Sequence, residues 1–187
     1  MNTSAPRPAR PGRQWLYATA VFVTAVASCV PAQARGVYQT PADFLAETFP
    51  GTPPPPGFLW LRETLVDQVK AALGHDLPGL RVRYWLRDGR SAWVLEEIGK
   101  EKPITVGFVV AHGAIERVRV LIFRESRGYE VRHGAFTEQF EGARLEEDYR
   151  LDRSIDGISG ATLSVDALTR LARTVLVLDR YREQHAQ

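Results

Sequence analysis

Residues 81–98 read RVRYWLRDGRSAWVLEEI. The apolar residues Val82, Tyr84 and Leu86 recur at a period of two between arginines, which indicates a β-strand. Asp88-Gly89 then supplies a two-residue turn, and a second apolar run follows it. The pattern therefore predicts a β-hairpin.

The following stretch repeats this pattern. Residues 104–110 again place apolar side chains at every second position, His112-Gly113 turns the chain, and residues 115–122 form an apolar return strand. The chain contains no internal repeat. Two hairpins in succession predict one antiparallel sheet.

Three helices are expected around this sheet. A short amphipathic helix is predicted over 42–49, and a second over 61–73, where Gly74 ends the apolar spacing. A stiff proline-rich connector, 51–57, separates the two. The last helix is the clearest, since it carries an apolar stripe of Leu168, Leu171, Ala172, Val175 and Leu178. The predicted class is α+β, a single domain with an antiparallel sheet of hairpins packed with helices.

The first 34 residues have the features of a secretory signal. Arg7, Arg10 and Arg13 form a positive segment, residues 15–28 are uncharged and largely apolar, and Ala32-Gln33-Ala34 offers small residues for cleavage. The apolar stretch is shorter than the roughly 20 residues that span a bilayer, so cleavage is favoured over a retained anchor. We expect the protein outside the cytoplasm, in the periplasm or an equivalent compartment.

A lipid anchor is the alternative exit. Val26-Ala27-Ser28-Cys29 resembles the lipobox of bacterial lipoproteins, in which the cysteine is lipidated. Cys29 is the only cysteine of the chain, so it also fits a small apolar residue that is lost with the signal. Both interpretations predict export from the cytoplasm, and the lipid anchor would keep the protein on a membrane.

The charge of the mature chain excludes one class of partner. Removing residues 1–34 takes away three arginines and no acids, which leaves 21 basic against 22 acidic residues. Basic and acidic residues are interspersed rather than clustered, so a nucleic-acid partner is not expected. Without a further cysteine, the mature chain has no disulfide and no thiolate metal site, and no histidine pair has the spacing of a helical metal site. No metal is predicted.

A loop of small residues precedes the last helix. It reads Asp156-Gly157-Ile158-Ser159-Gly160-Ala161-Thr162, and a helix start of this kind offers free backbone N–H groups and a favourable dipole to a phosphate. By itself the loop is a weak indication of an anion site. Ser159 or Thr162 could equally cap the helix, and the glycines could simply form the turn.

The same heptapeptide resembles the D-x-x-[ST]-G-A-T flavinylation motif of the FMN-binding domain family. This family includes the C subunit of the sodium-translocating NADH:quinone reductase and the G subunit of the Rnf complex. The similarity extends over residues 103–178 and includes Glu125-Ser126-x-Gly128-Tyr129-Glu130 and a segment from Phe136 to Phe140. It departs from the respiratory subunits at Ser126, where threonine is more frequent, and in lacking a further glycine after Gly128.

The resemblance implies a covalent cofactor. In such relatives a periplasmic flavin transferase moves FMN from FAD onto the threonine hydroxyl, and the matching residue is Thr162. It further implies that Gly160 and Ala161 are recognised by the transferase, that Asp156 positions a metal or the hydroxyl during transfer, and that Ser159 and Glu125 belong to the cofactor site. Together with the signal and connector predicted above, the expected organisation is a signal peptide, 1–34, an N-terminal segment with its connector, 35–57, and an FMN-binding domain, 58–187, in which the resemblance is strongest over 103–178.

On this basis we expect an extracytoplasmic electron-transfer flavoprotein rather than a self-standing enzyme, with a membrane redox partner. Nothing resembles a nicotinamide fingerprint. Two alternatives remain: an exported module that holds FMN or another phosphorylated ligand without a covalent bond, and, less favoured, a serine hydrolase that uses Ser159, since Gly157-x-Ser159 begins like a nucleophile elbow.

Residues 41–98 resemble no family, and their hairpin is expected either to pack against the flavin domain or to form the docking face for a partner. The aromatic residues Trp60, Trp85, Trp93 and Tyr129 are interpreted as core rather than as flavin contacts, because aromatic residues at strand spacing usually pack inside.

Overall fold

The computed structural model describes residues 1–2 and 36–185, and residues 33–187 form one compact unit. The predicted signal peptide with its cleavage site, and the candidate lipid attachment at Cys29, lie outside the described residues. Within the described part, no helix combines the length and the hydropathy that a membrane span requires.

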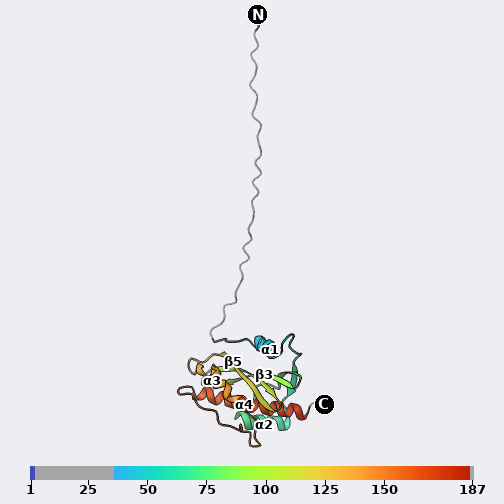
Figure 1. Cartoon of the computed structure of the whole chain (residues 1–187), viewed down its shortest axis with the longest axis vertical. Coiled ribbons are helices and arrows are strands. Elements are labelled where there is room, and N and C mark those ends of the chain that lie inside the picture. The colour runs from blue at the N-terminus through green and yellow to red at the C-terminus, as the bar shows by residue number, and fades with distance from the viewer. Residues whose placement is uncertain (3–35, 186–187) are drawn as a thin grey trace. The chain divides into compact units, whose positions relative to one another are not determined.

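A five-stranded sheet forms the centre of this unit (Figure 1). The strands are β1 (Gly57–Trp60), β2 (Arg81–Arg87), β3 (Arg90–Ile98), β4 (Pro103–Ala111) and β5 (Ala114–Phe123). They lie in sequence order, and every neighbouring pair is antiparallel. Both predicted hairpin turns, Asp88-Gly89 and His112-Gly113, have positive φ at each residue, as tight two-residue turns require. The predicted antiparallel sheet of hairpins is confirmed.

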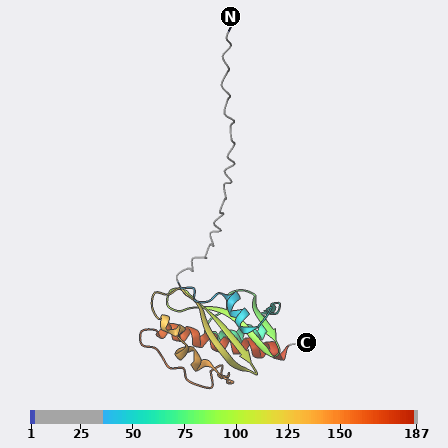
Figure 2. The same ribbon diagram turned by 45° about the horizontal axis from the view of Figure 1, so that its top comes forward.

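Helices cover both faces of the sheet (Figures 1 and 2). The larger core lies between the sheet and two helices, α2 (Glu63–Leu73) and α4 (Thr162–Gln184). A smaller core lies under α1 (Pro41–Thr48), whose Phe44 and Leu45 contact residues of β3, β4 and β5. Short helical turns, η1 (Tyr129–Arg132), α3 (Gly134–Thr137) and η2 (Glu138–Phe140), connect β5 to the loop before α4. The α+β class is confirmed.

The beginning of the chain's second helix differs from the prediction. Residues after the proline run were expected to enter a helix at Leu61, but Gly57–Trp60 form strand β1, and α2 begins only at Glu63. The strand has four residues, too few to show a period of two in the sequence, and it exists because it pairs with the edge of β2. The predicted end of α2 is correct, since Gly74 has the left-handed conformation there.

The aromatic residues divide between core and surface. Trp93 is fully buried, as predicted, and stacks on Tyr84 with ring centroids 5.2 Å apart. Trp60 and Tyr129 are instead 47% and 49% exposed, so the core interpretation is wrong for both. Trp60 lies on the edge strand β1, where α1 does not cover the sheet face, and Tyr129 begins a surface turn.

Residues 36–98 and the remainder of the chain share one sheet and one core. Strand β3 pairs with β4 along its whole length, and Leu65, Val69 and Trp93 belong to the same buried cluster as the apolar stripe of α4. Of the two alternatives that the sequence left open for the first hairpin, the structure shows packing against the rest of the domain.

A buried polar network also ties the first hairpin to α4. The hydroxyl of Ser91 donates to Asp179 Oδ1 at 2.6 Å and accepts from the Trp93 indole at 2.8 Å. The guanidinium of Arg182 donates to the same carboxylate oxygen, at 2.9 and 3.0 Å. Both charged residues are buried, so each satisfies the other.

Candidate functional site

The start of α4 is an uncapped helix N-terminus. The N-cap residue is Ala161, whose side chain has no hydrogen-bonding atom, and no other side chain of the described residues caps the first turn. The first turn also contains no acidic residue. The N–H groups of Thr162, Leu163 and Ser164 therefore point out of the helix without an intrahelical acceptor. The hypothesis that Ser159 or Thr162 caps the helix is wrong.

The loop before this helix is held in place from both sides. Ile155 and Ile158 pack against the main core, and the backbone N–H of Asp156 donates to Gln139 Oε1 at 2.7 Å. The N–H of Ala161 donates to the carbonyl of Ile158 at 2.9 Å. Gly160 has φ of +82°, a backbone conformation that favours glycine, so the turn itself requires a glycine there.

The residues of the helix start divide between an inward and an outward side. Ala161 and Ser164 are each only 4% exposed, whereas Thr162 and Leu163 are exposed. The inward pair packs against Gly128, which follows β5 and has φ of +83°. A Cβ on Gly128 would lie 2.8 Å from Ser164 Oγ and 3.4 Å from Ala161 Cβ, so only glycine allows this approach. The packing explains small residues at these positions and leaves the Thr162 hydroxyl outside.

A cavity of about 520 Å³ opens in front of the helix start. It is lined by residues of three segments, the β3–β4 turn, the chain after β5 and the first turn of α4. Lys100 and Arg127 contribute cationic side chains to it, and Arg127 makes no ion pair within the described chain. The helix N-terminus adds further positive potential, so the cavity suits an anion.

Glu125 lies at this cavity, but its carboxylate is engaged with the protein. Its Oε1 accepts hydrogen bonds from the backbone N–H groups of Lys100, Glu101 and Lys102, at 2.5, 2.6 and 2.9 Å. Burial acts to raise the pKa of this carboxyl, but these hydrogen bonds outweigh it, and the pKa lies below its ordinary value of 4.5. Glu125 thus fixes the turn that carries Lys100.

A second anchor holds the strand that leads into this turn. The buried carboxylate of Glu97 accepts from Arg170 of α4 at 3.1 Å and contacts the His75 ring at 3.1 Å. Hydrogen bonds to the backbone of Asp76 and to Glu97 raise the pKa of His75, against the opposing effect of burial. Helices α2 and α4 are thereby joined to the end of β3, which stabilises the position of the cavity wall.

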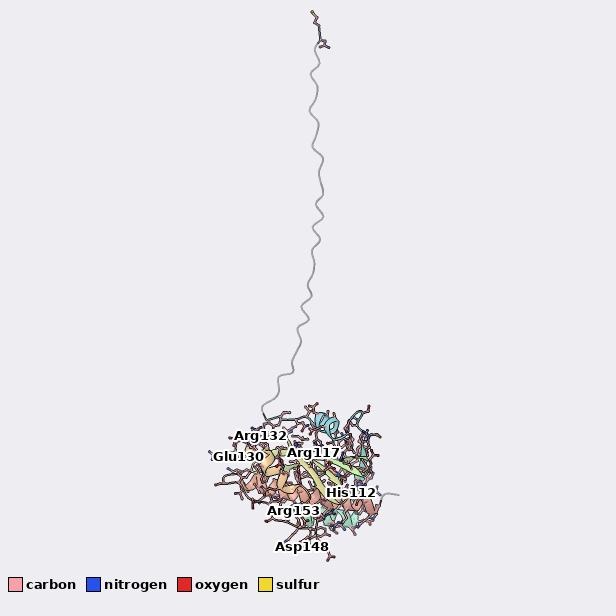
Figure 3. All side chains as sticks on the ribbon, viewed as in Figure 1. His112, Arg117, Glu130, Arg132, Asp148 and Arg153 are labelled. Carbon is pink, nitrogen blue, oxygen red and sulfur yellow. The ribbon has the colours of Figure 1, made fainter. Side chains whose placement is uncertain are left out.

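The structure brings four of the six predicted site residues to one cavity. Gly160, Ala161, Thr162 and Glu125 all line it. Ser159 and Asp156 are exposed in the preceding loop and do not contribute to the lining. The cavity is lined from the β3–β4 turn and the chain after β5, at the end of the sheet opposite to the β4–β5 turn. Glu130 and Arg132, which follow β5, lie on one side of the molecule, and His112 of the β4–β5 turn lies on the other (Figure 3).

Two cationic residues of the cavity were not identified from the sequence. Lys100 stands in a charged turn that resembles any solvated loop, and Arg127 is one of 24 basic residues without a distinguishing motif. Only the pairing of β3, β4 and β5 brings both turns to the start of α4.

Ser159 lacks the surroundings of a hydrolytic nucleophile. It sits in a turn after an extended segment that is not a strand, whereas a nucleophile elbow follows a buried strand. Among the described residues, no histidine is hydrogen-bonded to it: His75 contacts Glu97, and His185 contacts the Tyr181 carbonyl. The geometry therefore does not favour acyl transfer.

Comparison with known proteins gives one match. Residues 99–177 match the family model described as the FMN-binding domain. This segment is therefore similar to FMN-binding domains. It begins in the turn that carries Lys100 and ends in α4, so it contains every residue that lines the cavity. No curated protein matches the chain, and no solved structure matches it.

The residues of the cavity fit the phosphate end of FMN. A phosphate accepts hydrogen bonds and carries negative charge, and the site offers uncapped N–H groups with two cationic side chains. The match to the FMN-binding domain supports flavin binding. The cavity offers hydrogen-bond donors and cationic side chains that suit the phosphate of such a cofactor. The three segments of the site come from the matched part of the chain.

Proposed function

We propose that the protein is an extracytoplasmic electron-transfer flavoprotein that carries FMN as a phosphoester on Thr162. The observation that supports this most strongly is the position of Thr162: it is the first residue of an uncapped helix, it is exposed, and it lines the cationic cavity. A phosphate bonded to its hydroxyl would lie beside the free N–H groups of the same turn.

The attachment requires a transferase and FAD. Thr162 Oγ forms a bond to the phosphorus of the FMN half, the diphosphate bond of FAD breaks, and AMP leaves with the bridging oxygen. The hydroxyl proton passes to a base of the transferase, and nothing is oxidised or reduced. Thr162 is reachable for this reaction because its neighbours Gly160 and Leu163 are also exposed, while the buried Ala161 keeps the loop in position.

The protein's residues then hold the cofactor in place. Lys100 and Arg127 lie where they can neutralise the phosphoester, and Glu125 orders the turn of Lys100 through its three backbone hydrogen bonds. The bound flavin would supply one- and two-electron redox chemistry. The expected donor or acceptor is a redox partner at a membrane, reached after export by the N-terminal signal.

The competing function is a module that binds FMN, or another phosphorylated ligand, without a covalent bond. The same cavity would serve it, but the bond to Thr162 would be absent. The two functions differ in what happens when the protein is denatured, because only a covalent flavin stays with the chain.

The test is the intact mass of the exported protein, coexpressed with a flavin transferase. We expect wild type to gain the mass of FMN less one water and to retain yellow colour and flavin fluorescence in denaturant. Thr162→Ala should gain nothing. Ser159→Ala is the matched control, because it removes a hydroxyl from the same exposed loop and should be flavinylated like wild type.

Two other outcomes would overturn the proposal. If wild type and Thr162→Ala both release FMN on denaturation, the module binds flavin noncovalently. If neither variant carries flavin although the transferase labels another substrate in the same cells, the site serves a different anion. Once the flavin is attached, reduction and reoxidation followed at the flavin absorption band test its redox role.

A further inference from the structure

An arginine–aromatic patch lies at the β1–β2 edge of the sheet, on the face opposite to α2 and α4. We define it as Phe58, Trp60, Arg62, Arg81, Arg83 and Trp85. The strand register places Phe58 opposite Arg83 and Trp60 opposite Arg81. Their neighbours in the register, Leu59 and Val82, contact the main core, so the patch lies on the other sheet face. The α1 cluster on that face is built on β3, β4 and β5 and reaches β2 only at the partly buried Trp85, so Phe58, Trp60, Arg81 and Arg83 lie outside it.

The guanidinium groups of the patch stack on its rings. Arg81 lies 4.1 Å from the ring centroid of Phe58 and 5.5 Å from that of Trp60, and Arg62 lies 5.6 Å from Trp60. Arg83 lies 5.9 Å from both Phe58 and Trp85. These contacts hold cations and rings together in one layer.

The positive charge of the patch is not neutralised within the protein. Arg62, Arg81 and Arg83 form no ion pair with the described residues, whereas other arginines do. Two carboxylates of neighbouring elements, Glu96 and Glu47, pair with other arginines, Arg124 and Arg117. The patch therefore offers three cations to an outside partner.

The rings of the patch are unusually exposed for their size. Phe58 and Trp60 are 40% and 47% exposed. Scattered apolar residues on a surface are ordinary, but here two aromatic rings lie together among arginines. Indole and phenyl rings favour the headgroup region of a bilayer, and basic residues favour its anionic phosphates.

The position of the patch agrees with a membrane. The described chain enters the fold at Gly36, and Val37 pairs with Ile122 of β5. The sheet register runs from Ile122 through Thr105 to Glu96, and continuing the β2–β3 register leads to Arg81 and Trp60. The Trp60–Arg81 end of the patch and the point where the described chain enters the fold thus lie at the same end of the sheet.

We propose that this patch docks the protein on an anionic phospholipid surface. The rings of Phe58 and Trp60 would lie at headgroup depth, while the three arginines bind lipid phosphates. Docking does not depend on flavin, because no patch residue lines the flavin cavity.

Vesicle cosedimentation of the exported full chain tests the proposal, with phosphatidylcholine vesicles against vesicles that also contain phosphatidylglycerol. We expect Arg81→Gln/Arg83→Gln to weaken binding to the anionic vesicles by about five-fold per arginine, roughly 25-fold together, at low salt. High salt should remove the difference. The matched control is Arg90→Gln/Arg150→Gln, which makes the same charge change at two exposed arginines outside the patch and should bind like wild type.

A second readout locates the contact. Lipids with brominated chains should quench part of the tryptophan fluorescence of wild type, and Trp60→Phe should lose that part while still binding. The buried Trp93 should not be quenched in either protein. Comparing the two proteins removes any contribution of the N-terminal segment, since both carry it. Thr162→Ala should bind vesicles like wild type, so failure of flavinylation and failure of docking are separate results.

Three results would overturn the proposal. The first is equal binding of the double arginine variant and wild type to anionic vesicles, with unchanged circular dichroism showing that both are folded. The second is lipid quenching that Trp60→Phe does not change. The third is a double arginine variant that binds vesicles like wild type but exchanges electrons more slowly with an acidic redox protein. This result would assign the patch to a protein partner instead.

Discussion

Glu125→Gln tests whether the site depends on a carboxylate that orders a turn. Three backbone N–H groups converge on Glu125 Oε1, at 2.5 to 2.9 Å. A glutamine of the same shape keeps an oxygen acceptor there and loses only the charge. Hydrogen bonds to a charged group contribute about 1.5–3 kcal/mol and neutral ones about 0.5–1.5 kcal/mol. Because the three bonds share one oxygen and their gains do not add, we expect a loss of about 1–2 kcal/mol in the free energy of unfolding.

The pH dependence gives this prediction its sign. The pKa of Glu125 is lower in the folded protein than its ordinary value of 4.5, so the unfolded state binds the proton more readily. The stability from the carboxylate is therefore fully present above pH 4.5 and is lost as the pH falls through the lower folded-state pKa. Wild type should exceed Glu125→Gln in stability at neutral pH, and the two should converge in acid.

The assay is urea unfolding of both proteins, followed by circular dichroism at a series of pH values. Glu116→Gln is the matched control: its carboxylate is exposed and pairs with Arg90, and such pairs contribute less than about 1 kcal/mol. Equal stability of wild type and Glu125→Gln at neutral pH would show that the charge of Glu125 does not stabilise the turn. A difference that persists in acid would show that the variant acts through its shape and not through its charge.

Two further substitutions test the packing around the site. Gly128→Ala forces a left-handed backbone conformation on alanine, which costs about 1–2 kcal/mol, and places a Cβ against the first turn of α4. Urea unfolding should therefore show a loss of about 2 kcal/mol or more in the free energy of unfolding, and flavin incorporation should fall. Unchanged stability would mean that the first turn of α4 shifts to make room for the added Cβ. Asp179→Ala leaves the buried Arg182 guanidinium with only the half-exposed carboxylate of Glu183, 3.3 Å away, and should cost about 3–5 kcal/mol in the same assay. A loss under about 1 kcal/mol would show that Glu183 or water satisfies the guanidinium in place of Asp179.

Most of the architecture could be predicted because its elements are local and periodic. The two hairpins follow from alternation and from turn residues that tolerate positive φ, and α4 follows from its apolar stripe. Strand β1 could not be predicted, because four residues carry no period and their pairing with β2 is decided by tertiary contact. The exposed position of Trp60 escaped prediction for the same reason, since it depends on which half of the sheet α1 covers.

The candidate site was likewise predictable only in part from the sequence. The loop from Asp156 to Thr162 is contiguous, so its motif and the following helix were visible in the sequence. Lys100 and Arg127 come from two turns separated by strands β4 and β5, and nothing in either turn distinguishes them from solvated charges. Glu125 was associated with the cofactor through family resemblance, and the structure adds a definite task, the ordering of the Lys100 turn.

The choice of residue at the N-cap of α4 separates the two interpretations that the motif left open. A helix that needed only a stable start would carry serine, threonine, aspartate or asparagine there, and alanine in their place costs about 0.5–2 kcal/mol. This chain has Ala161 at the cap, no acid in the first turn, and serine and threonine placed on either side, where neither caps. The helix thus keeps its N–H groups free, beside two cations, at the expense of its own stability. Free donors at a cationic helix start have a use when an anion occupies them, and a phosphate on Thr162 would supply the missing cap.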